Sequence, residues 1–180
     1  MRDLTPLPAC LWLSASLLLA CGASDEGPAA GSGSIQGKVA GKTFQSVGAS
    51  YVIGESDDPD HTVVVYVFDR PIECSQIGSP GWDTTIADAS QALEMKLIGT
   101  KPATYPVAAG PNAGQGEASV NYTLSSTAHT PLEISSTAGS VKLDSVKSEG
   151  PAAGSFDLTF PDGTLGGSFS AVWCSNGHEP

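Results

Sequence analysis

The chain has 180 residues, of which 40% are hydrophobic and 15% charged, and its 8 Lys and Arg against 19 Asp and Glu give a net charge of −11. This length allows one domain with a substantial hydrophobic core, and the apolar content excludes a chain that is disordered throughout. The acidic balance offers phosphate groups no basic surface, so we expect no nucleic-acid partner. The 21 Gly and 13 Pro residues disfavour an all-helical fold, because both residue types destabilise helix interiors.

Residues 1–20 are predicted to be an export signal. No side chain between residues 4 and 24 carries a charge, and residues 9–20 form an apolar run. A run of about a dozen apolar residues is typical of a signal peptide, whereas a membrane-spanning helix needs about 20. Pro6 and Pro8 also interrupt the start of the run, which leaves a single anchor helix as the weaker alternative.

The apolar run ends in the sequence Leu18-Leu19-Ala20-Cys21-Gly22. These five residues and the run before them resemble the lipobox of bacterial lipoproteins. The resemblance implies cleavage before Cys21, a diacylglycerol on its thiol and an acylated new amino terminus, which together anchor a protein stably to a membrane. Gly22, in place of Asp, implies sorting to the outer membrane of a Gram-negative bacterium. The alternative is an ordinary signal peptide that happens to contain Cys21.

Two further segments follow the signal. Residues 21–33 contain no large apolar side chain, so they are predicted to be a flexible tether of Gly, Ser and Ala. Residues 34–180 are predicted to form a single domain, because their length suits one compact unit.

Apolar and polar residues alternate through most of this domain, which indicates half-buried strands. The segment 63–68, VVVYVF, is apolar at both parities and predicts a central strand covered on both faces. We therefore expect an all-β fold, an antiparallel β-sandwich or flattened barrel of about 8–10 strands with little helix. In chain order the clearest predicted strands are 35–39, 43–44, 63–68, 92–98, 118–124, 155–160 and 164–173, with tight turns at Ala40-Gly41 and Pro161-Asp162-Gly163.

Residues 83–98 allow two interpretations. Ile86, Ala89, Leu93 and Leu97 fit the period of a helix that Asp83 could cap. A strand over 92–98 is favoured, because Gly99-Thr100 and Lys101-Pro102 then end it as a turn.

The chain holds four cysteines, and each has a predicted fate. Cys10 is removed with the signal, and Cys21 carries the lipid. Cys74 and Cys174 are then an even pair in a chain exported to an oxidising compartment, which predicts a disulfide. Two free buried thiols are the alternative.

Acidic residues are densest in the loop 55–60, which contains Asp57, Asp58 and Asp60. Carboxylates at this density are the ligands that Ca²⁺ prefers, so these three residues are weak candidates for a metal site. Their spacing does not match a known calcium loop, and a solvated hairpin tip is the favoured interpretation.

No motif predicts catalytic residues or a cofactor, since no Ser, Cys or paired carboxylate stands in a known catalytic frame. Trp82, between Gly81 and Asp83 in a predicted loop, is a weak candidate for a binding anchor. The alternative is that Trp82 covers one end of the core.

The chain as a whole resembles bacterial lipoproteins that carry a small β-sandwich behind a Gly/Ser tether. The resemblance rests on the lipobox, on the opening sequence at residues 37–44 and on the closing hairpin at residues 154–174. It implies a membrane-anchored envelope protein with a non-enzymatic binding or structural role, whose partner is an envelope protein or a glycan. A Ca²⁺-binding module is the second hypothesis, and a hydrolase whose site is assembled in space is the third.

Overall fold

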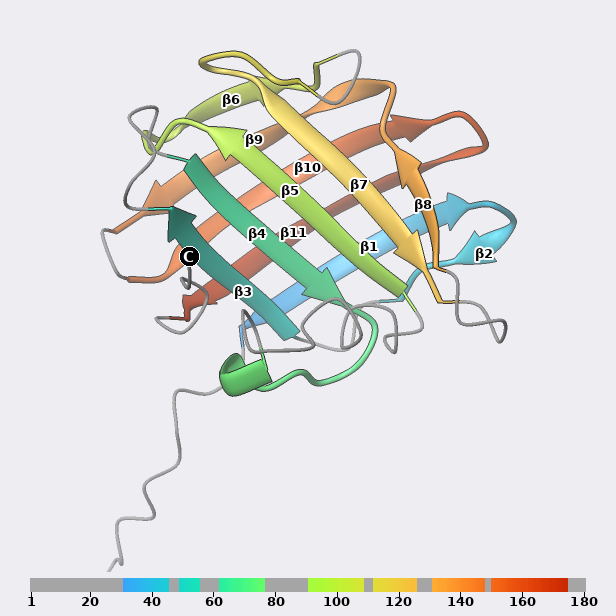
Figure 1. Cartoon of the computed structure of the whole chain (residues 1–180), viewed down its shortest axis with the longest axis horizontal. Helices are drawn as coiled ribbons and strands as arrows, with labels where there is room; N and C mark the ends of the chain where they lie inside the picture. Colours follow the sequence, from blue (N-terminus) through green and yellow to red (C-terminus); the bar gives the residue numbers. More distant parts are fainter. Residues whose placement is uncertain are drawn as a thin grey trace, which may run out of the picture.

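The computed structural model describes residues 31–45, 49–55, 62–76, 91–108, 112–125, 131–147 and 150–174 (Figure 1). Over these ranges the chain forms eleven strands and one short 3-10 helix. The elements are β1 (Ser32–Val39), β2 (Lys42–Thr43), β3 (Ala49–Glu55), β4 (Thr62–Phe68), η1 (Cys74–Gln76), β5 (Gln91–Ile98), β6 (Ala103–Pro106), β7 (Ala118–Leu124), β8 (Leu132–Ser135), β9 (Ala138–Val146), β10 (Ala152–Phe160) and β11 (Gly163–Trp173).

The strands form two antiparallel sheets that pack face to face, which confirms the predicted all-β sandwich. One layer contains β6, β9, β10, β11 and β1, and the other contains β3, β4, β5, β7 and β8. Strand β11 joins the layers, because its end pairs in parallel with β3 through Val172 and Trp173. Figure 1 shows the strands of the two layers crossing diagonally.

Two crossover segments join the outer edges of the layers. Val107 follows β6, donates its N–H to the Gly139 carbonyl at 3.0 Å, and also forms a bridge with Ala118 of β7. Ser136 follows β8 and donates its N–H to the Val120 carbonyl of β7 at 2.9 Å. The fold is therefore a sandwich whose edges approach closure, as in a flattened barrel.

The closing hairpin is confirmed, and its second strand, β11, is the longest of the described strands. Strands β10 and β11 pair in unbroken register up to Phe160 and Gly163, around the turn at Pro161 and Asp162. Gly163 has a φ of +139°, and a Cβ at this position would overlap the Lys38 carbonyl of β1. This position therefore requires glycine, because only glycine adopts that backbone conformation and allows so close an approach.

Strand β4 is covered on both faces, as its apolar sequence predicts. Val63, Val65 and Val67 belong to the main core between the sheets. On the opposite face, Phe68 is buried in a smaller apolar cluster. Strand β4 therefore contributes side chains to two separate apolar clusters.

The ambiguous region forms a strand where it is described. Strand β5 pairs with β4 on one side and with β7 on the other. Leu93, Met95 and Leu97 are fully buried, while Glu94 and Lys96 alternate with them on the other face. The strand prediction for 92–98 is confirmed against the helix, and residues 83–90 lie outside the described residues.

The boundaries differ from the predictions in three places. Strand β1 begins at Ser32, two residues before the expected start of the domain at 34, because Ser32 and Gly33 pair with β11 through their backbones and need no apolar side chain. Strand β2 ends at Thr43, and Phe44 beyond it is buried in the core. The described residues form eleven strands, above the expected range, because short strands such as β6 and β8 are too brief to show alternation.

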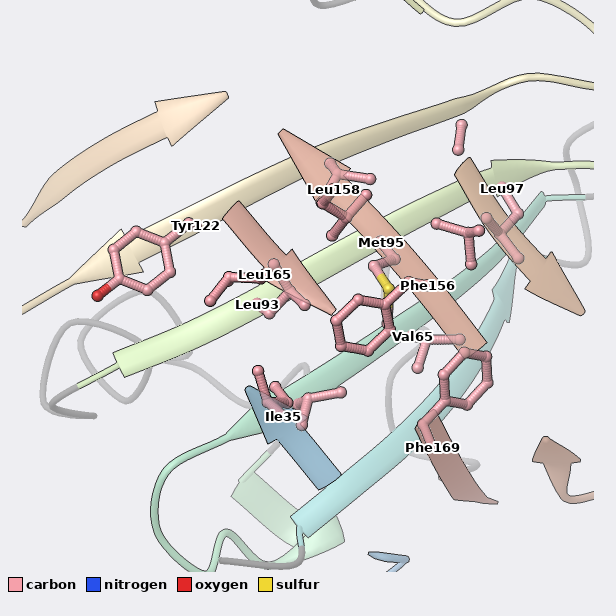
Figure 2. Close-up of a cluster of buried hydrophobic side chains, with 14 of the residues drawn as sticks. Ile35, Val65, Leu93, Met95, Leu97, Tyr122, Phe156, Leu158, Leu165 and Phe169 are labelled. Atoms are coloured by element: carbon pink, nitrogen blue, oxygen red, sulfur yellow. The ribbon is translucent and has the colours of Figure 1, made fainter. Parts of the chain in front are cut away.

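The main core fills the space between the sheets with aliphatic and aromatic side chains. Figure 2 shows Phe156, Leu158 and Leu165 of one layer meeting Leu93 and Met95 of the other. This dense packing fixes the ends of the strands, and the polar residues described next lie at one such end.

Candidate functional site

The predicted disulfide is present. Cys74 in η1 and Cys174 just after β11 are joined, with their Cα atoms 5.4 Å apart and a sequence separation of 100. This Cα separation is usual for a protein disulfide. The bond ties the segment after the central strand β4 to the end of the hairpin.

The other predicted site residues lie outside the described residues. They are the lipid-attachment residue Cys21, the weak metal candidates Asp57, Asp58 and Asp60, and the binding candidate Trp82. The strands that flank the acidic loop pair at Glu55 and Thr62, so residues 56–61 connect the two strands of a hairpin.

The described part of the chain contains neither a cluster of metal ligands nor a membrane-spanning helix. Among these residues, no group of three or more His, Cys, Asp or Glu side chains could hold a metal ion. Within the same ranges, no helix is long and apolar enough to cross a membrane.

Five residues form a polar cluster where β4 ends, β5 begins and β7 ends. We call these residues, Thr43, Asp69, Arg70, Gln91 and Tyr122, the polar cluster. The Tyr122 hydroxyl donates to Gln91 Oε1 at 2.8 Å, and Gln91 Nε2 donates to the Thr43 carbonyl at 3.1 Å. The Asp69 N–H donates to the Gln91 carbonyl at 3.1 Å and extends the β4–β5 ladder by one residue.

Tyr122 connects the polar cluster to the main core. Its ring packs edge-on against Phe44 and Phe160, with centroids 6.0 and 6.1 Å away. Figure 2 shows its hydroxyl pointing away from Leu93 and Leu165. Burial is the larger cause and the nearby charge of Asp69 the smaller, and together they raise the pKa of Tyr122 to about 12. The phenol therefore stays protonated at neutral pH and acts as a hydrogen-bond donor.

Tyr122→Phe is expected to lower the free energy of unfolding at pH 7 by about 1 kcal/mol, because Gln91 Oε1 loses its donor. The variant should also lose less stability than the native chain when the pH is raised from 7 to 11. A tyrosine whose pKa is raised in the folded state supports folding below its ordinary pKa of about 10, and this support is lost as the pH rises toward about 12. Urea unfolding at pH 7 and pH 11 measures both effects. If the native chain and the variant lost the same stability between pH 7 and pH 11, the raised pKa of Tyr122 would be contradicted.

Asp69 and Arg70 carry the charges of the cluster. Among the described residues, Asp69 Oδ1 and Arg70 Nε are the buried side-chain atoms without a hydrogen-bond partner. Burial raises the pKa of the Asp69 carboxyl, although backbone hydrogen bonding from Gln91 and the charge of Arg70 oppose that shift. Both groups are therefore incompletely satisfied, which is unusual for buried polar atoms.

Asp69→Asn is expected to become more stable relative to the native chain as the pH rises from 3 to 7. A carboxyl whose pKa is raised in the folded state supports folding below its ordinary pKa, and that support is lost as the pH rises through the folded value. The asparagine variant cannot ionise and so avoids this loss. Urea unfolding at several pH values measures the difference, with Asp157→Asn on the exposed face of β10 as the control. A difference that does not change with pH would refute the expectation.

The side chains of the polar cluster can donate and accept hydrogen bonds. A carboxyl and a guanidinium can accept and donate hydrogen bonds to a polar partner. Thr43 contributes its backbone carbonyl, and the Tyr122 hydroxyl is already bonded to Gln91. Covalent catalysis requires a nucleophile with an adjacent base, and these five residues do not include such a pair.

Sequence reasoning did not find this cluster. Its members come from four separate stretches of the chain, and the β4–β5–β7 register brings them together. One signal was available, because Asp69 and Arg70 follow the most apolar strand directly. A charged pair at that position is forced to lie at the edge of the core.

Comparison of the chain with protein-family models, with curated proteins and with solved structures found no match.

Proposed function

We propose that this chain is an exported lipoprotein, anchored through lipid on Cys21 to the outer membrane of a Gram-negative bacterium. Its β-sandwich would serve there as a non-enzymatic binding or structural module. The observation that carries the proposal is the sequence Leu18-Leu19-Ala20-Cys21-Gly22 at the end of an uncharged apolar run. The residues that follow, 22–31, would separate the lipid from β1, which begins at Ser32.

Two features of the folded part support export and a binding role. The Cys74–Cys174 disulfide suits an oxidising compartment, since such bonds rarely persist in a reducing cytosol. The polar cluster places a half-buried carboxyl and a half-buried guanidinium at one end of a filled core, where a polar partner could bind them. An envelope protein or a glycan is therefore the partner that we propose.

Cell fractionation tests the anchor. The native chain is expected in the outer-membrane fraction, and Cys21→Ser is expected in the soluble periplasm or as an uncleaved precursor. Cys10→Ser is the matched control, because Cys10 lies within the predicted signal and should leave the fractionation unchanged. Identical fractionation of Cys21→Ser and the native chain would refute lipid anchoring.

The calcium hypothesis has a separate test. Millimolar Ca²⁺ should raise the Tm of the protein if Asp57, Asp58 and Asp60 bind the ion, because a ligand that binds only the folded state stabilises it. An unchanged Tm, with no heat of binding in calorimetry, would exclude that hypothesis.

A further inference from the structure

We propose that residues 69–76, named here the strap, form a redox-releasable cover on the outer face of the sheet. Reduction of the Cys74–Cys174 disulfide would detach the strap from the end of β11 and expose the apolar surface beneath it, while the main core stays folded. This inference concerns the folded part alone and holds whether or not Cys21 carries lipid.

The strap covers an apolar cluster that is separate from the main core. Ile72 is its buried anchor, with 2% of its surface exposed. It packs with Phe68, Ala92 and Cys174, and none of these four residues belongs to the core between the sheets. Detaching the strap therefore disturbs this outer cluster without opening the sandwich.

The strap is attached to the sheet at its start, at its middle and at its end. At its start, the Asp69 N–H donates to the Gln91 carbonyl at 3.1 Å. Ile72 packs into the outer cluster, and Cys74 is bonded to Cys174. The disulfide is the one covalent attachment among these three, so it controls whether the strap stays closed.

The start of the strap also favours its release. Asp69 Oδ1 and Arg70 Nε are buried without hydrogen-bond partners when the strap is closed. Water would satisfy both atoms once the strap opens, and this gain offsets part of the lost contact of Ile72. Release is thus less costly than the exposure of Ile72 alone would suggest.

The required reductant is a dithiol, either a small molecule or a protein. Cys74 is partly exposed and Cys174 is 2% exposed, so the attacking thiolate should reach Cys74 Sγ. That attack breaks the disulfide, forms a mixed disulfide at Cys74 and releases the Cys174 thiolate, which takes up a proton. The second thiol of the reductant then displaces Cys74, which is also protonated. Two electrons and two protons pass to the protein, and the dithiol becomes a disulfide.

Hydrogen exchange with mass spectrometry, on the purified full-length chain with and without dithiothreitol, tests the proposal. We expect backbone amides in residues 69–76 to exchange at least about tenfold faster after reduction, because the strap is then free. The amides of β10 and β11 should remain protected and exchange more slowly than those of the strap after reduction, although the lower stability of the reduced protein speeds their exchange as well. Labelling of the two new thiols by an alkylating reagent confirms that reduction occurred.

Two variants sharpen the test. Cys74→Ser with Cys174→Ser should reproduce the fast exchange without reductant. Ile72→Ala with the disulfide intact should keep more protection in the strap than the reduced native protein.

Three results would overturn the proposal. The first is unchanged exchange in residues 69–76 after reduction, and the second is loss of protection in β10 and β11, which would mean that the whole fold opens. The third is failure of dithiothreitol to reduce the disulfide in the folded protein.

Discussion

Replacing Cys74 and Cys174 together with Ala is expected to lower the free energy of unfolding by about 5 kcal/mol. The bond closes a loop with a sequence separation of 100 residues. Joining the ends of so long a loop restricts the unfolded chain, and the chain-entropy model gives about 4.7 kcal/mol for this effect. Loss of packing around Cys174 in the outer cluster adds to it. This is a large fraction of the stability of an ordinary domain, which is about 5–15 kcal/mol.

Urea unfolding of the non-reduced proteins at pH 7 measures this loss. Both cysteines are replaced, because a single remaining thiol could form bonds between molecules. Ser75→Ala is the matched control, since Ser75 is exposed between the bonded Cys74 and the end of η1. The control should change stability by no more than about 0.5 kcal/mol. A loss below about 1 kcal/mol in the double variant would contradict the expected restriction of the unfolded chain.

Leu158→Ala is expected to lower the free energy of unfolding by about 3 kcal/mol. Leu158 is fully buried in β10 and points into the main core, where Figure 2 places it near Leu165 and Met95. Truncation removes apolar contacts and leaves a cavity that paired strands cannot close. The same urea experiment measures the loss.

Asp157→Ala is the control for Leu158→Ala. It changes the preceding residue, which is exposed on the opposite face of β10. Its stability should stay within about 0.5 kcal/mol of that of the native chain. Equal effects of the two substitutions on stability would contradict the assignment of Leu158 to the core-facing side of β10.

Features that depend on local pattern were predictable from the sequence. The alternation of Phe156, Leu158 and Phe160 identifies one face of β10, and turn residues fix its partner β11. The unbroken apolar run of β4 indicates a strand with two covered faces. The Cys74–Cys174 pairing was predicted by setting aside the two cysteines assigned to the predicted signal and lipid attachment, without any knowledge of distance.

Features that depend on distant pairing were not predictable. The parallel contact of Val172 and Trp173 with β3 is specified by no local pattern. The polar cluster likewise exists because the β4–β5 register places Asp69 beside Gln91 and the β5–β7 register brings Tyr122 within reach. The strap follows from the disulfide together with the burial of Ile72, and the sequence indicated only the disulfide.

We propose that the protein is processed and lipid-anchored at Cys21. Mass spectrometry of the intact, non-reduced protein purified from the membranes of a Gram-negative host tests it most directly. We predict a chain that begins at Cys21, with a mass increased by a diacylglycerol and one further acyl chain, and with no alkylatable thiol at Cys74 or Cys174. A chain that retains residues 1–20, or one that carries an unmodified Cys21, would contradict the account.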